Sequence, residues 1–223
     1  MSYQRMSKLQ KTVRGIPELP MFSDATDKCP VCLQEKLFKA ARNKREKTQV
    51  TECNQGISVD FGFMVVRSKN KERFDRLVGL NGETCYCAIT DHKSGTVYGS
   101  TFRSKAPPLE WLNQWLVTNG RTKDEVQGVR FVRFDEGGDL GASNKVVSLF
   151  EEAGYDVQIT AADASASNGM GERPHRTIAD GIRCMLHGGG MDAKFWPYAF
   201  HHFLRVYNCQ THGDRELPSY QIC

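Results

Sequence analysis

The sequence lacks the features that mark several classes of protein. No apolar run among its 223 residues reaches the roughly 20 residues that a membrane-spanning helix requires, so we expect no membrane partner. The opening stretch, MSYQRMSKLQKTVRG, has no apolar core, so we expect no secretory signal. Internal repeats and low-complexity blocks are also absent. With 39% hydrophobic and 25% charged residues, the chain is expected to form one good-sized globular domain, or one domain plus a small appendage.

The eight cysteines do not follow the spacing of a small secreted disulfide scaffold. Cys85 and Cys87 alternate within an apolar run. On a strand they would therefore share one face as small buried side chains. We expect a reducing compartment, the cytosol or the nucleus.

Positive charge is concentrated at the start of the chain. Residues 1–50 hold 11 Lys and Arg against 5 Asp and Glu, whereas the remainder holds 19 against 21. A basic segment of this kind either binds phosphate backbones or is a solvated tail, and charge alone favours the tail. We therefore divide the chain into a basic N-terminal segment, 1–50, and a core domain, 51–223.

Hydrophobic periodicity predicts the elements of the core domain. Strands are expected at 57–66, 84–90, 96–102, 129–134 and 155–160, and helices at 108–119, 143–153, 168–187 and 193–208. Residues 67–83 are expected to form a charged loop closed by a hairpin turn at Asn81–Gly82, and Ser143 to cap a helix. The order, three strands and then alternating helices and strands, predicts an α/β fold with a mixed five-stranded sheet flanked by helices on both faces.

Three carboxylates lie at strand or helix boundaries. Asp60 interrupts an apolar strand, Asp135 ends another, and Glu172 lies near the start of a helix. Singly, Asp135 and Glu172 are best explained as a turn former and a cap. Together, the three are able to converge as oxygen ligands for Mg²⁺ or Mn²⁺, the ions that assist phosphoryl transfer.

Several motifs, in this order, resemble the copia-type integrase core of the retroviral integrase superfamily. They are Cys29-Pro-Val-Cys32, Val59-Asp60, Arg133-Phe-Asp135-Glu-Gly-Gly-Asp139, Asn168-Gly-Met-Gly-Glu172-Arg-Pro-His-Arg176-Thr, Phe195-Trp-Pro-Tyr-Ala199, Tyr207-Asn208 and Pro218-Ser-Tyr220. Asp135 and Glu172 are 37 apart in number, close to the spacing of that family. The resemblance covers roughly residues 29–223.

The resemblance implies a ribonuclease H-like fold and a two-metal integrase with Asp60, Asp135 and Glu172 as catalytic, Mg²⁺- or Mn²⁺-binding residues. A 3′-hydroxyl of retrotransposon DNA would attack a target phosphodiester, with or without earlier trimming of the 3′ end. The implied setting is a transposable-element polyprotein, a cytoplasmic particle stage and a nuclear reaction on chromosomal DNA. The implied partners are DNA and further copies of the chain.

The helix that carries Glu172 also predicts a DNA-binding face. At 100° per residue, Arg176 and Arg183 lie within about 40° of Glu172, while Ile178 and Ile182 point away from it. Arginine forks suit phosphate oxygens, although an intrahelical pair of Glu172 with Arg176 explains the same spacing. The family motif adds Arg173 and Asn168 as DNA contacts, and Asn168 is equally suited to cap the helix.

Two departures from the family leave alternatives open. Cys29 and Cys32 have zinc-ligand spacing, but no histidine precedes them, so we expect an incomplete module without tightly bound structural zinc. Glu136 adds a carboxylate beside Asp135, where the family has Asn. An inactive nucleic-acid-binding remnant of the same fold is therefore the alternative, with a ribonuclease H or junction nuclease ranked third. His175, His201 and His202 receive no role from the sequence.

Overall fold

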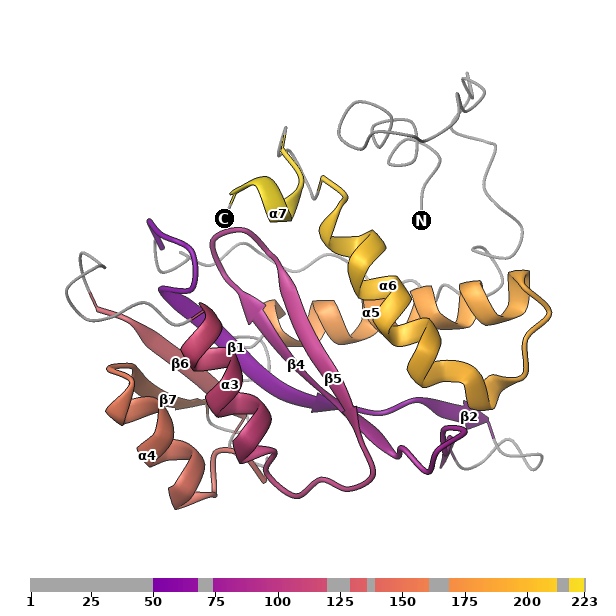
Figure 1. The fold of residues 1–223 in the computed structure, drawn as a ribbon, viewed down its shortest axis with the longest axis horizontal. Helices are drawn as coiled ribbons and strands as arrows, with labels where there is room; N and C mark the ends of the chain where they lie inside the picture. The colour runs from indigo at the N-terminus through magenta and orange to yellow at the C-terminus, as the bar shows by residue number, and fades with distance from the viewer. Residues whose placement is uncertain are drawn as a thin grey trace.

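The computed structural model describes residues 50–67, 74–119, 129–135, 139–160, 169–211 and 217–222, and only the backbone of Arg67, Phe74, Thr160 and residues 169–173 (Figure 1). The predicted N-terminal segment with Cys29 and Cys32 lies outside these residues. The elements are β1 (Gly56–Gly62), β2 (Val65–Arg67), β3 (Phe74–Arg76), β4 (Cys85–Asp91), β5 (Val97–Phe102), α3 (Leu109–Asn119), β6 (Phe131–Asp135), α4 (Asn144–Glu152), β7 (Asp156–Thr160), α5 (Gly169–Gly188), the 3₁₀ turn η3 (Ala193–Phe195), α6 (Trp196–Asn208) and α7 (Ser219–Ile222).

Five strands form one mixed sheet in the order β5-β4-β1-β6-β7. β4 pairs antiparallel with both β5 and β1, whereas β6 pairs in parallel with both β1 and β7. The predicted meander and the predicted change to alternating helices and strands are both confirmed. The central strand β1 thus joins an antiparallel half of the sheet to a parallel half.

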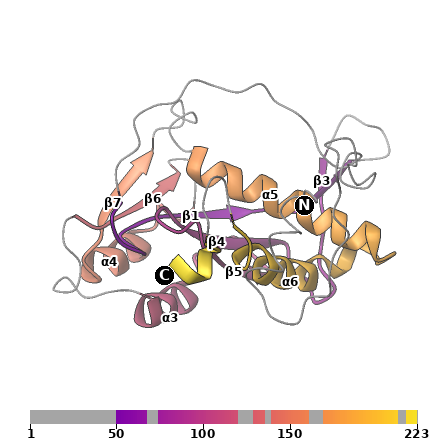
Figure 2. The same ribbon diagram turned by 90° about the horizontal axis from the view of Figure 1, so that it is seen from above.

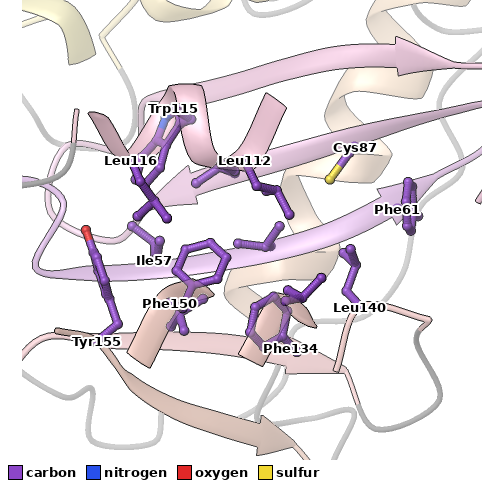
Figure 3. Close-up of a cluster of buried hydrophobic side chains, with 14 of the residues drawn as sticks. Ile57, Phe61, Cys87, Leu112, Trp115, Leu116, Phe134, Leu140, Phe150 and Tyr155 are labelled. Carbon is purple, nitrogen blue, oxygen red and sulfur yellow. The ribbon is translucent and has the colours of Figure 1, made fainter. Parts of the chain in front are cut away.

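Two apolar clusters hold helices against opposite faces of the sheet. Cys85, Cys87 and Ile89 of β4 belong to the cluster that α3 and α4 cover (Figure 3). Tyr86 and Ala88, which alternate with them, belong to the cluster that α5 and α6 cover. Figure 2 shows α5 on the opposite side of the sheet from α3 and α4. The predicted α/β architecture with helices on both faces is therefore confirmed, as is the shared buried face of the two cysteines.

The region between β1 and β4 differs from the prediction. The expected strand 57–66 is two strands, and the expected loop 67–83 contains β3, which pairs with β2 in a separate two-stranded sheet. The register explains the break, because Gly62 lies opposite Tyr86 and β4 offers only Cys85 beyond it. The turn at Asn81–Gly82 joins β3 to β4, which do not pair, so the expected hairpin is wrong.

Two helix starts also differ from the prediction. Ser143 occupies the N-cap position of α4 but makes no capping hydrogen bond with its side chain. The expected helix 193–208 begins with η3, where the carboxylate of Asp192 accepts a hydrogen bond from the Lys194 amide at 2.9 Å. α6 then starts at Trp196, with Pro197 in its first turn, where a missing amide hydrogen costs no helical bond.

A buried carboxylate organises the predicted turn between β4 and β5. Asp91 is fully buried and accepts hydrogen bonds from the Asn54 amide at 2.8 Å, the Ser94 amide at 2.7 Å and the Ser94 hydroxyl at 2.6 Å. Gly95 closes the turn with a φ of 72°. These three hydrogen bonds replace those that water would make to the Asp91 carboxylate.

Among the described helices, none is long and apolar enough to cross a bilayer.

Candidate active site

Asp60 lies in the middle of β1 on the face that α5 covers. Its neighbours Val59 and Phe61 belong to the cluster under α3 and α4, and successive strand residues point to opposite faces. The Phe61 amide donates a hydrogen bond to Asp60 Oδ1 at 2.7 Å. The side chain of Asp60 keeps 34% of its surface exposed, so its carboxylate remains accessible to a ligand.

Asp135 is the last residue of β6, and its side chain is exposed. Ser58 of β1 lies opposite Arg133 of β6 in parallel register. Asp60 and Asp135 each lie two residues beyond this pair, and both line the same small cavity. Two of the three predicted acids therefore lie near one another, on neighbouring strands.

A hollow of about 240 Å³ lies where β6 ends beside β1. We call it the acidic hollow, and its lining residues are Val59, Asp60, Phe61, Phe63, Lys105, Asp135 and Leu140. Its volume exceeds by several-fold the roughly 30 Å³ that one water molecule occupies in the liquid. It therefore has room for solvent or for a phosphate oxygen beside the two carboxylates.

Lys105 brings a positive charge to the acidic hollow. Its Nζ lies 3.0 Å from the Asp139 carboxylate and 5.4 Å from the centre of the Phe63 ring. The Arg76 guanidinium lies 4.1 Å from the centre of the same ring. Sequence reasoning missed both residues, because Lys105 lies in a connecting segment that no motif marks and Phe63 was assigned only to the expected strand 57–66.

The third predicted acid, Glu172, lies in the first turn of α5, and its side chain is outside the described part of the structure. His175 fixes this end of the helix on β1, because its Nε2 lies 3.5 Å from Asp60 Oδ2. Glu172 precedes His175 by three residues, less than one helical turn. The helix backbone thus carries position 172 close to the strand that holds Asp60.

His175 is the residue beside Asp60 that sequence reasoning most clearly missed. Burial lowers its pKa to about 4, so the imidazole is neutral at pH 7. Its Nδ1 lies 3.2 Å from the hydroxyl of Tyr86, and the two rings stack with centres 5.5 Å apart. Burial raises the pKa of Tyr86 above its ordinary value, so this hydroxyl stays protonated. The pattern gave no sign of these contacts, since Tyr86 lies 89 positions away.

The predicted DNA-binding residues are only partly described. Arg176 is exposed, whereas Arg183 is half-buried and pairs with Asp180 at 3.2 Å. Asn168 and the side chain of Arg173 lie outside the described residues. The predicted packing face is confirmed, because Ile178 and Ile182 are fully buried.

The two described carboxylates suit a hard divalent cation. Both supply oxygen donors, both reach solvent and both line the acidic hollow. Within the described residues, no group of three His, Cys, Asp or Glu side chains gathers, and the carboxylate of Glu172 is outside that set. Cys53 is disulfide-bonded, so this sulfur is not a zinc ligand in the structure.

The chain was compared with models of known protein families and with curated protein sequences. No family model matches it. No curated protein matches it either.

Proposed function

We propose that this chain is an integrase of ribonuclease H-like fold that transfers a DNA 3′ end to a target strand. The observation that carries the proposal is the convergence at β1, where Asp60 shares the acidic hollow with Asp135 and contacts His175 of the Glu172 helix. The mixed sheet with helices on both faces supports the fold assignment. The motif resemblance supplies the reaction class. The proximity of Asp60 and Asp135 in the fold is a separate observation that supports this class.

The reaction is an exchange of phosphodiester bonds. The 3′ oxygen of the element DNA forms a bond to a target phosphorus, and the bond from that phosphorus to the target 3′ oxygen breaks. When bound, Mg²⁺ or Mn²⁺ supplies charge that stabilises the attacking and leaving oxygens. Asp60, Asp135 and Glu172 are the residues that would hold these ions, and Arg176 offers an exposed guanidinium to a phosphate.

The other parts of the proposal follow from the same resemblance. DNA is the partner, both as element ends and as target duplex, and the chain acts as a homo-oligomer within a retrotransposon product. The site of action is the nucleus, after a cytoplasmic particle stage. Arg173, Arg183 and Asn168 complete the proposed DNA contacts.

The test is strand transfer from an oligonucleotide duplex with a free 3′-hydroxyl into a target plasmid, in Mg²⁺ or Mn²⁺. Asp60→Asn, Asp135→Asn and Glu172→Gln should each lower the rate about 1,000-fold, which corresponds to roughly 4 kcal/mol of transition-state stabilisation. The matched control is Asp156→Asn. Asp156 is an exposed acid at the opposite end of the parallel strand pair from Asp135, and this variant should keep the wild-type rate.

Two outcomes would overturn the proposal. Full activity in any one of the three acid variants would remove that residue from the mechanism. Salt-sensitive DNA binding without metal-dependent joining or cleavage by the wild-type chain would favour the inactive nucleic-acid-binding remnant instead.

A further inference from the structure

Three polar side chains form a continuous chain across three elements. Asp60 of β1 lies 3.5 Å from Nε2 of His175 on α5, and Nδ1 of the same ring lies 3.2 Å from the hydroxyl of Tyr86 on β4. Both ring nitrogens of His175 are thus engaged, one by a carboxylate and one by a phenol. The proposed reaction uses only the first member of this chain.

The position of the single ring hydrogen follows from the chemistry of the two partners. A neutral imidazole carries one N–H, on either Nδ1 or Nε2. An ionised carboxylate only accepts hydrogen bonds, so the hydrogen belongs on Nε2, which faces Asp60. Nδ1 then carries a lone pair toward the Tyr86 hydroxyl, 3.2 Å away, and this hydroxyl can donate to it as well as to the His175 carbonyl oxygen at 3.5 Å. The opposite tautomer would leave two lone pairs facing each other between His175 and Asp60.

Tyr86 is a rigid anchor for this chain. It is 1% exposed, and its ring centre lies 4.7 Å from that of Phe200 and 6.4 Å from that of Trp196, both on α6. Gly62 lies opposite Tyr86, where a Cβ would come within 2.1 Å of the tyrosine ring. The ring therefore fills the space over Gly62 and packs against α6, with its hydroxyl beside His175.

We propose that His175 is a positioning residue that holds the Asp60 carboxylate through Nε2–H, with its own ring held by the Tyr86 hydroxyl. Histidine and carboxylate partners behind a metal ligand orient it in the same way, and their loss commonly costs 10–100-fold in metal affinity. The functional part of the inference rests on the proposed role of Asp60, whereas the hydrogen-bond chain does not.

The first experiment determines the tautomer of His175 in the full chain at pH 7 by ¹⁵N NMR of labelled histidine. Comparison with His175→Gln identifies the resonances. The expected result is a ring with hydrogen on Nε2, and Tyr86→Phe should shift the Nδ1 resonance. A ring whose only hydrogen is on Nδ1 would overturn the inference.

The second experiment measures Mn²⁺ affinity by calorimetry. His175→Leu fills similar space but donates nothing and should weaken binding at least about 10-fold. His175→Gln places an amide N–H near the position of Nε2 and should recover most of that loss. The matched control is His187→Gln, an exposed histidine in the last turn of α5, which should bind as the wild type does.

The outcomes separate the two proposals. Equal weakening by the Leu and Gln variants would assign His175 a packing role only and overturn the inference. A wild-type chain that binds no Mn²⁺ would instead count against the proposed function, and the tautomer would then decide the hydrogen-bond chain by itself.

Discussion

The close contact between α5 and α6 permits a prediction with opposite signs at two glycines of one helix. A Cβ at Gly181 would lie 2.0–2.5 Å from three ring atoms of Phe203, a residue that is 6% exposed in the core of the α5–α6 cluster. A Cβ at Gly188 would meet nothing within 4 Å. Gly181→Ala should therefore destabilise the chain, while Gly188→Ala should leave it unchanged or more stable.

The magnitude follows from two opposing effects. Alanine is favoured over glycine inside a helix by about 1 kcal/mol, because the unfolded chain loses less entropy on folding. Forcing a methyl group into packed side chains costs typically 1–3 kcal/mol. The overlap at Gly181 lies at the severe end, so we expect a net loss of about 1–2 kcal/mol, or roughly 2–8 °C in Tm for a domain of this size.

The assay is urea unfolding of the full chain followed by circular dichroism. Phe203→Leu provides a second arm, because a smaller side chain should relieve the overlap and make Gly181→Ala less costly in that background. Stability of Gly181→Ala equal to or above that of the wild type would refute the claim that backbone proximity at this glycine sets the α5–α6 packing.

Three further perturbations test other parts of the structure. Asp91→Asn should lower the free energy of unfolding in urea by about 3 kcal/mol. The carboxylate of Asp91 accepts hydrogen bonds from three buried donors, and the amide group of Asn would turn N–H groups toward some of them. Wild-type stability would contradict this account of the turn. Burial lowers the pKa of His92 from 6.5 to about 4, so its neutral form favours folding above pH 6.5. That advantage should be lost between pH 6.5 and 4, by up to about 1.4 kcal/mol per pH unit, and a parallel stability profile for His92→Gln would exclude it. Lys105→Gln should weaken duplex DNA binding, and the slope of log binding constant against log salt concentration should fall in magnitude by about one, as measured by fluorescence anisotropy. Lys145→Gln, at an exposed site on α4, should change neither quantity. Identical slopes for Lys105→Gln and the wild type would exclude Lys105 as a phosphate contact.

Most of the sheet was predictable because its signal is local. Alternation within single segments marked β4, β5 and β6, and the helical spacing of buried residues marked α3 and α5. The pair β2–β3 was missed because β1 stops pairing where β4 begins, at Cys85, and the local hydrophobic pattern does not record that boundary. The same limit applies to Ser143, whose residue type suits a cap that its side chain does not make.

The site divides along the same line. Asp60 and Asp135 could be proposed from the sequence because carboxylates at strand boundaries coincide there with the motifs of one family. His175 and Lys105 were not, because their roles depend on neighbours contributed by other elements. Which nitrogen of His175 faces Asp60 depends on the tertiary structure and has no signal in the sequence.

The parallel pairing of β1 with β6 has a consequence for how the chain folds. The antiparallel strands join residues close in sequence, so their loops close early and at low entropic cost. Asp60 and Asp135 are 75 positions apart in sequence, so they meet only when the parallel pair of β1 and β6 forms. We therefore expect the two carboxylates to come together late in folding, in a step whose driving force comes from the apolar residues of β6. A divalent cation that binds both carboxylates only in the native arrangement should stabilise that late contact against unfolding.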